Sequence, residues 1–130
     1  MSEKQLEWFE RLLRIRMTQC GLGWFHHGGC IGGDTQAHWI ARKLGYKIDL
    51  HPPLDEKFQE PGIKAFCDSV EEKFSYSGRN HRIVLATRIL FATPNGTSQN
   101  GGTWNTIQHA ARISRTRTII YRNGRIEEFS

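Results

Sequence analysis

Hydrophobic positions follow two spacings along the chain, one typical of helices and one typical of strands. Apolar side chains three and four positions apart (Leu6, Phe9, Leu13, Met17) predict an amphipathic helix over residues 3–18. The same spacing predicts helices over residues 34–44, 63–74, 79–87 and 103–114. Short apolar or alternating runs predict strands at Gly21–Phe25, Tyr46–His51, Arg88–Ala92, Thr118–Tyr121 and Arg125–Phe129.

The order of these elements predicts the fold class. Short strands lead into turns and then helices, which is typical of an α/β protein with a mainly parallel sheet and helices on both faces. Asn123–Gly124 lies between the last two strands and predicts a C-terminal hairpin. A chain of 130 residues fits one domain spanning residues 1–130.

Turn and cap residues refine these boundaries. Asp34 is expected to N-cap the second helix and Gly45 to end it. Ser77 or Gly78 is expected to cap the helix that follows, so that Arg79 and Asn80 would open it. The stretch Pro94–Gly102 is rich in turn-forming residues and predicts a loop.

The amino-acid composition limits the classes of possible binding partner. The net charge of +5 suits an anionic partner, either a phosphate-bearing small molecule or a nucleic acid, although a solvated basic surface explains it equally well. Three cysteines without a C-x-x-C pair argue against a disulfide framework. The charged N-terminal segment does not resemble a signal peptide, and no apolar run reaches membrane-spanning length. We therefore expect no membrane partner and a cytoplasmic location.

The stretch Trp24–His38 reads WFHHGGCIGGDTQAH and predicts a binding site. A strand that leads through glycines into a helix N-terminus is the arrangement that α/β proteins use to hold phosphates. It is neither a Walker A loop nor a G-x-G-x-x-G motif, and a tight connection without a ligand is the alternative. His26–Asp34, His51–Pro53 and Thr93–Thr103 each follow a predicted strand, so they are expected to meet at one site.

Four segments together resemble a known family. HHGGCIGGDTQAH, a strand ending in HPP, GRNHRIV and GGTWNTIQHA are similar to motifs of small stand-alone members of the SLOG superfamily, often phage or bacterial. These Rossmann-like proteins are related to the LOG phosphoribohydrolases and the DNA-uptake processing proteins. The resemblance implies a single Rossmann-like domain that binds a nucleotide-derived molecule, such as an ADP-ribose derivative or a cyclic nucleotide signal. It also implies a sensor or a sequestering sponge, for example in phage anti-defence.

The resemblance and the glycine loops give a set of expected ligand-binding residues. They are His27, Gly28, Gly29, Cys30, Gly32, Gly33, Asp34, His38, His51, Arg79, Asn80, Gly101, Gly102, Thr103 and Trp104. For four of them a structural role is an equal alternative. Asp34 would only cap its helix, Arg79 would be an exposed side chain, Asn80 a helix cap and Trp104 a core residue rather than a base-stacking one.

The chain departs from the family in two respects. Asn105 and Thr106 stand where LOG enzymes carry glutamates, and neither can act as a general acid or base. We therefore predict no catalytic residue and favour binding over catalysis. N-glycosidic hydrolysis of a nucleoside monophosphate with Asp34 as the carboxylate is one alternative. The usual first strand is also missing, which favours a homo-oligomer that covers the sheet edge.

Two other chemistries are compatible with the sequence. Five residues have side chains suited to zinc (His26, His27, Cys30, His38, His51), but their spacing is looser than that of strong zinc motifs, so no metal or cofactor is expected. Nucleic-acid binding is the other alternative. It would use the basic C-terminal region formed by Arg112, Arg115, Arg117, Arg122 and Arg125.

Overall fold

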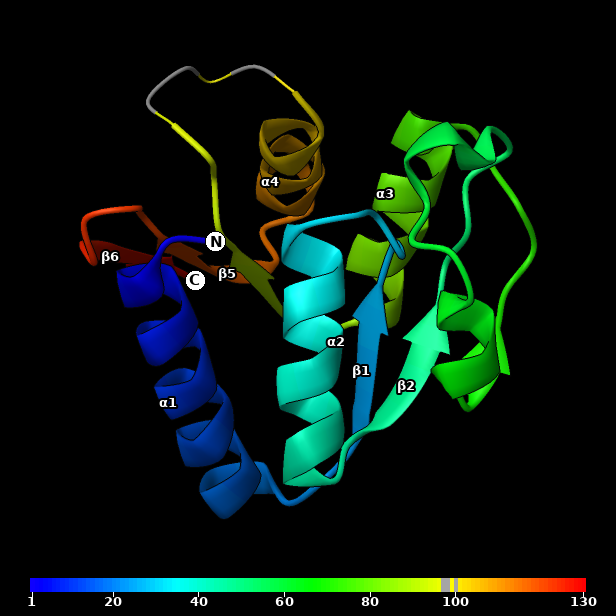
Figure 1. The fold of residues 1–130 in the computed structure, drawn as a ribbon. Coiled ribbons are helices and arrows are strands. Elements are labelled where there is room, and N and C mark those ends of the chain that lie inside the picture. Colours follow the sequence, from blue (N-terminus) through cyan, green and yellow to red (C-terminus); the bar gives the residue numbers. More distant parts are fainter. Residues whose placement is uncertain (97–98, 100) are drawn as a thin grey trace.

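The computed structural model describes residues 1–96, 99 and 101–130. In this part of the chain four α-helices alternate with short strands (Figure 1). The helices are α1 (Glu3–Cys20), α2 (Gly33–Leu44), α3 (Tyr76–Ala86) and α4 (Gly102–Arg112). The strands are β1 (Trp24–His27), β2 (Lys47–Leu50), β3 (Ser69–Val70), β4 (Ile89–Ala92), β5 (Thr116–Ile120) and β6 (Ile126–Phe129). Two 3-10 turns, η1 (Glu56–Phe58) and η2 (Ile63–Phe66), precede β3.

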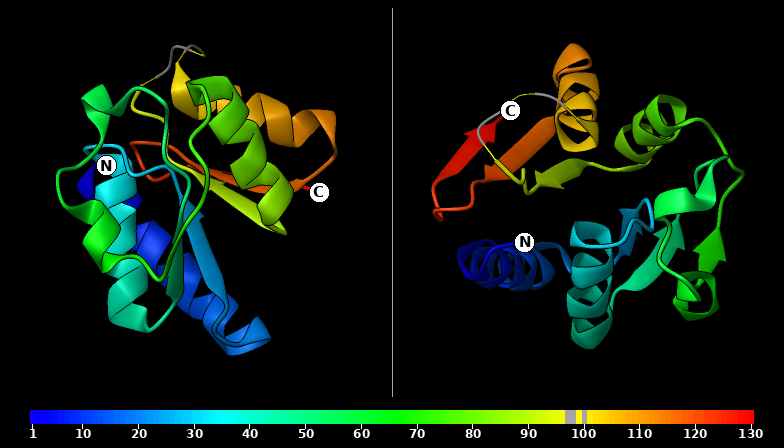
Figure 2. Two further views of the ribbon diagram at one scale, coloured as in Figure 1. Left: turned by 90° about the vertical axis from the view of Figure 1, so that its right-hand side faces the viewer. Right: turned by 45° about the horizontal axis from the view of Figure 1, so that its top comes forward.

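The strands form two sheets of three. One has the order β1-β2-β3 and is entirely parallel, while the other has the order β4-β5-β6, with β4 parallel and β6 antiparallel to β5. The predicted α/β class is confirmed. The expectation of one continuous sheet is not, because β1 and β4 are the edge strands of separate sheets (Figure 2).

Neighbouring residues of β5 show how the helices cover the sheets. Ile120 packs with Phe9, Leu13 and Ile48 in a core cluster formed mainly by α1, α2 and β2. Ile119 packs in a second cluster formed by α3, β4 and α4. Successive strand residues point to opposite faces, so the two helix pairs lie on opposite faces, as predicted. The first cluster contains Ile48 and Ile120, and it therefore joins the two sheets.

Helix ends follow local sequence in most places. Ser2 begins α1 with a capping box, and Gly45 ends α2 in the left-handed conformation with φ +100°. The third helix begins earlier than predicted, with Ser75 rather than Ser77 or Gly78 as its N-cap. None of the described helices is long and apolar enough to cross a membrane.

One predicted strand is shifted along the chain, and one predicted helix is wrong. The first strand covers Trp24–His27 instead of Gly21–Phe25, so it includes both His26 and His27. The helix expected over residues 63–74 is only one 3-10 turn followed by β3. Asp68 explains the second error, because its N–H donates to Ile48 O and its Oδ2 accepts from Ile48 N–H. These bonds align the segment with β2, so tertiary pairing overrides its helical spacing.

The C-terminal hairpin agrees with the prediction only in part. Strands β5 and β6 pair antiparallel from Arg117↔Phe129 to Ile120↔Ile126, and Gly124 occupies the turn with φ +90°. The first strand begins earlier than expected, and Tyr121 lies beyond its end. Of the predicted Pro94–Gly102 loop, residues 97, 98 and 100 lie outside the described residues.

Candidate ligand-binding site

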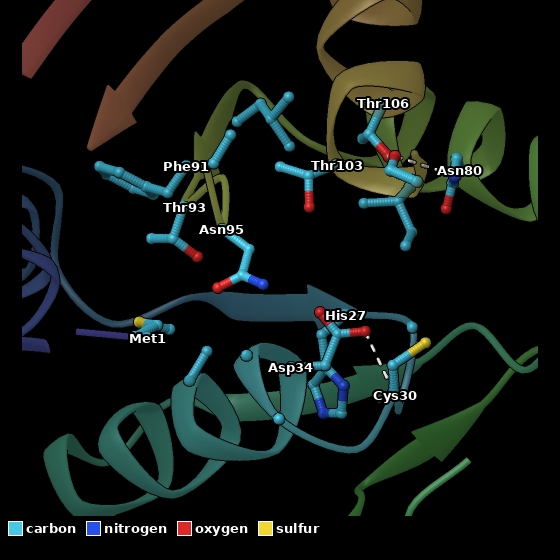
Figure 3. A pocket seen from close by; sticks show the side chains of 18 of the residues that line it. Met1, His27, Cys30, Asp34, Asn80, Phe91, Thr93, Asn95, Thr103 and Thr106 are labelled. Atoms are coloured by element: carbon cyan, nitrogen blue, oxygen red, sulfur yellow. Dashed lines mark hydrogen bonds between the residues drawn. The ribbon is translucent and has the colours of Figure 1, made fainter. Parts of the chain in front are cut away.

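A cavity of about 500 Å³ lies between the two sheets. Its lining comes from β1, β4 and all four helices, and Figure 3 shows Thr93, Thr103 and Thr106 across from Asp34 and Cys30. The free edges of β1 and β4 belong to opposite sides of this space. Its volume falls within the usual range for small-molecule sites, roughly 300–1,000 Å³.

Most of the residues expected from the sequence line this cavity. Those that do are His27, Gly28, Cys30, Gly32, Gly33, Asp34, Arg79, Asn80, Gly102 and Thr103. Those that do not are Gly29, His38, His51, Gly101 and Trp104. Two of the three segments expected at one site, His26–Asp34 and Thr93–Thr103, therefore contribute to this cavity, whereas His51–Pro53 does not line it.

The first glycine pair of the loop is packed against other side chains. A Cβ at Gly28 would lie 2.3 Å from Arg79 Nη1, and one at Gly29 would lie 2.7 Å from Leu50 Cδ1. Gly29 also has φ +74°, which side-chain-bearing residues rarely adopt. These glycines make room for the protein itself, contrary to the expectation that they make room for a ligand.

The second glycine pair borders open space. A Cβ at Gly32 would meet no heavy atom within 4 Å, and the nearest one to Gly33 is Thr93 Oγ1 at 3.9 Å. Gly32 has φ +99° and is the N-cap of α2, without a side-chain cap. Asp34 was expected to be this N-cap, and that prediction is wrong because Asp34 lies inside the first turn.

The start of α4 repeats this arrangement. Its N-cap is Gly101, with φ +92° and no side-chain cap, and Gly102 and Thr103 line the cavity. The other two helices differ, because Ser2 and Ser75 accept hydrogen bonds from backbone N–H groups at the starts of α1 and α3. Glycine-capped helix starts thus occur at α2 and α4, and residues of both first turns line the cavity. Free backbone N–H groups and the helix dipole both favour an anion there.

Asp34 is the only carboxylate among the described residues that line the cavity. Its Oδ2 accepts the Cys30 N–H at 3.1 Å, and Thr35 Oγ1 donates to Cys30 O at 2.9 Å. The loop is also tied to the η1 region, where Ile31 N–H donates to Phe58 O. The loop conformation is therefore fixed before any ligand arrives.

Arg79 has a structural role that the sequence did not predict. It lies inside α3 rather than opening a helix, and only 4% of its surface is exposed. Its Nη1 donates to Gly28 O at 2.6 Å and to His51 O at 3.2 Å, and its Nε donates to Asn80 Oδ1 at 2.9 Å. The guanidinium thus joins the ends of β1 and β2 to α3, and it is already engaged rather than free for a phosphate.

Asn80 and Asn105 join α3 to α4. Asn80 does not cap a helix; its Nδ2 donates to Asn105 Oδ1 at 3.1 Å and to Gly102 O at 3.4 Å. Thr106, in the second position where LOG enzymes carry glutamate, lines the cavity and donates to Gly102 O at 2.9 Å. These contacts hold the start of α4 against the cavity.

His27 and His38 form a buried pair behind the loop. His27 Nδ1 accepts the Gly29 N–H, so its Nε2 carries the proton and donates to His38 Nδ1 at 2.9 Å. Burial lowers the pKa of His27 to about 4 and lowers the pKa of His38 as well, so both rings are neutral near pH 7. Burial and the nearby Asp34 raise the pKa of the Cys30 thiol, which is therefore not activated as a nucleophile.

Several lining residues were missed from the sequence. Thr93 and Asn95 follow β4 and line the cavity. The predicted convergence of Thr93–Thr103 with the other strand ends could have identified both residues. No pattern in the sequence indicated that Gln5 would line the cavity. Its fully buried Nε2 donates to Pro94 O and Ile120 O, which fixes the segment that carries Thr93 and Asn95.

The remaining expected residues lie elsewhere. Trp104 packs against the core cluster of α3, β4, α4 and β5, which agrees with the structural alternative for this residue. His51 lines a second cavity on the other side of Arg79. Cys30, which only the disfavoured metal alternative placed with His27 and His38, is not grouped with them; Cys67 is the third residue there.

Comparison of the sequence with family models, and comparison of the chain with curated proteins and solved structures, gave no match. The resemblance to the SLOG superfamily therefore stays a prediction from its motifs.

Proposed function

We propose that the chain binds a nucleotide-derived small molecule in the cavity between the sheets and acts as a sensor or a sequestering protein. The observation that carries this proposal is the pair of glycine-capped helix N-termini, at Gly32 and Gly101, on two sides of one cavity. Each such terminus favours an anion, and two around one space suit a ligand with two phosphates or a pyrophosphate.

Neutral polar side chains supply the second half of nucleotide recognition. Thr93, Asn95 and Thr103 line the cavity beside the helix starts (Figure 3). Hydroxyl and amide groups both donate and accept hydrogen bonds, which suits ribose hydroxyls and base edges. Asp34 adds one acceptor for a ribose hydroxyl or a base amine.

The motif resemblance supports the same site, because both its HHGGCIGGD and its GGTW segment contribute to the cavity lining. We also propose that the two sheets are halves of a Rossmann-like arrangement with strand order β3-β2-β1-β4-β5-β6. The facing edges of β1 and β4 support this, since ligands of such folds bind where the strand order reverses.

Hydrolysis is less well supported than binding. General acid and base catalysis of glycosidic cleavage commonly uses two carboxyl groups, whereas the described lining offers Asp34 alone. Asn105 stands where a LOG glutamate would be, and its Oδ1 already accepts a hydrogen bond from Asn80 Nδ2.

Calorimetric titration tests the proposal with ADP-ribose, cyclic ADP-ribose and a cyclic dinucleotide. Gly33→Asp places a negative charge in the first turn of α2, where it suits the helix dipole but repels phosphate. We expect wild type to bind one of these ligands and Gly33→Asp to bind it at least about tenfold more weakly, a loss of about 1.4 kcal/mol. Gly23→Asp adds the same charge where nothing lies within 4 Å of its Cβ position, and it should bind like wild type.

Two outcomes would count against the proposal. Absence of both heat and a shift in melting temperature with every ligand would refute it. Release of free base from adenosine monophosphate, detected by chromatography and abolished in Asp34→Asn, would favour the hydrolase instead.

A further inference from the structure

The parallel sheet carries a second polar cluster on the face turned away from α2. His26 and Asp49 are direct neighbours in the register of β1 and β2, and His51 follows two residues after Asp49. Strand alternation therefore puts all three on one face, opposite Ile48 and Leu50. They line a cavity of about 630 Å³ against α3.

The ligand atoms of this cluster converge closely. His26 Nδ1 lies 2.9 Å from His51 Nε2 and 3.3 Å from Asp49 Oδ2, and the last two atoms are 3.6 Å apart. Zinc holds nitrogen and oxygen ligands at about 2.0–2.1 Å, so the edges of its coordination tetrahedron measure about 3.3–3.4 Å. The three observed separations scatter around this length.

We propose that His26, Asp49 and His51 form a binding site for a divalent transition-metal ion of the zinc class. Two imidazoles and one carboxylate are a donor set that suits such ions, and three protein ligands leave a fourth position open. That position faces the second cavity. The site lies on the opposite face of the sheet from the His27–His38 pair and shares only His26 and Arg79 with the lining of the proposed nucleotide cavity.

A buried carboxylate with one unpartnered oxygen supports the assignment. Asp49 is only 5% exposed, and its Oδ1 makes no hydrogen bond to any described residue. A buried charged oxygen is normally hydrogen-bonded, paired or bound to a metal. A cation bound through Oδ2 would neutralise the buried charge, and bidentate binding would also give Oδ1 a partner.

Charges around the cavity act in both directions. Glu71 and Glu72 line it and attract a cation, and Glu71 directly follows β3 on the neighbouring strand. Arg79 and Arg82 line it as well and oppose a cation. The two carboxylates balance the two guanidinium groups, which leaves the Asp49 charge to favour the metal.

A rival cluster, His27, His38 and Cys67, fits a metal less well. Their ligand atoms lie within 4.8 Å of one another. However, His27 Nδ1 already accepts the Gly29 N–H, which places the proton on Nε2, the nitrogen that faces His38. Binding a metal through Nε2 would sacrifice that backbone bond. No described backbone N–H donates to either ring of the proposed site, so a metal would have to replace only the hydrogen bond between His26 Nδ1 and His51 Nε2.

Titration of chelator-treated protein with Co²⁺ and Zn²⁺ tests the proposal and separates the two clusters. We expect one equivalent of metal to bind and the Co²⁺ complex to lack a thiolate charge-transfer band. Asp49→Asn keeps the side-chain shape but removes the charge, and it should weaken binding by at least about tenfold. Cys67→Ser is the matched control and should bind like wild type.

Folding is checked on the metal-free variants. Asp49→Asn removes a buried unpaired charge, so its melting temperature without metal should equal or exceed that of wild type. His26→Gln provides a second variant and should also lose metal binding. The proposal is overturned if wild type binds no metal, or if Cys67→Ser loses binding while folded Asp49→Asn retains it.

Discussion

The two glycine pairs of the loop between β1 and α2 have the same sequence and opposite surroundings. Added side-chain atoms at Gly28 and Gly29 would collide with Arg79 and Leu50. At Gly32 and Gly33 they would enter open space or the cavity. The first pair lets the protein pack against its own backbone, whereas the second leaves the backbone of a helix start bare.

This difference teaches that a glycine-rich loop does not by itself identify ligand-contacting positions. Glycine permits close approach of any atom, whether it belongs to a ligand or to a buried arginine. The glycines that face the cavity, Gly32 and Gly33, can be identified only from the open space beside them in the structure. Substitutions in the two halves should therefore affect different properties, stability in the first and binding in the second.

Gly28→Ala should have the largest effect. The new Cβ would displace the Arg79 guanidinium from Gly28 O and His51 O, which leaves a buried charge with fewer partners. Losing the partners of a buried charge costs about 3–5 kcal/mol. We expect a loss of that size in the free energy of unfolding, measured by urea denaturation.

Gly23→Ala is the matched control for this substitution, because nothing lies within 4 Å of its Cβ position. It should change the free energy of unfolding by less than about 0.5 kcal/mol. Equal stability of Gly28→Ala and Gly23→Ala would mean that the first pair is not a packing device.

Acidification should produce the next largest effect, through His27 behind the first glycine pair. Its folded pKa is lowered to about 4, from 6.5, so its contribution to stability is complete above pH 6.5 and is lost as the pH falls from 6.5 to 4. A shift of this size corresponds to about 3 kcal/mol. His51, with a pKa also lowered to about 4, acts in the same direction.

Asp49 opposes this trend. Burial and then the neighbouring Glu71 raise the pKa of Asp49 to about 6, so its contribution to the free energy of unfolding increases as the pH falls from 6 to 3.8. This gain cancels roughly the loss that one histidine causes. The net loss between pH 7.5 and 4.5, measured by urea unfolding, should therefore be at least that of His27 alone, because the pKa values of His26 and His38 are lowered as well. His27→Gln can keep both hydrogen bonds and should reduce the loss. An unchanged pH dependence in this variant would contradict the assignment.

Gly33→Ala should have the smallest effect on stability. Alanine suits a helix better than glycine, and Thr93 Oγ1 at 3.9 Å is an ordinary contact distance, so we expect a change within about 0.5 kcal/mol. The added methyl group narrows the proposed phosphate position and should weaken binding by about tenfold in calorimetry. Full affinity in this variant would place the ligand away from the second glycine pair.

The sequence predicted the features that depend on local spacing. Four helices and most strands followed from apolar periodicity, and Gly45 marked the end of α2 correctly. The convergence of the glycine loop with the segment after β4 followed from a general rule about strand ends. Each of these inferences uses information contained within a few neighbouring residues.

Features that depend on distant partners could not be predicted. Arg79 follows Gly28 by 51 positions, and Gln5 lies 89 positions before Pro94. The division of the histidines into two clusters depends on the β1–β2 register, which pairs His26 with Asp49. Asp49 itself was overlooked, because a single acid in an alternating strand resembles an ordinary exposed residue.

Arg79 has a further consequence, because its side chain lines both cavities. A ligand that shifts this guanidinium in one cavity changes the electrostatic potential and the wall of the other. Thermodynamic linkage then requires reciprocity: if a nucleotide alters metal affinity by some factor, the metal alters nucleotide affinity by the same factor. A nucleotide and a metal bound at the two proposed sites would thus be coupled through one buried arginine.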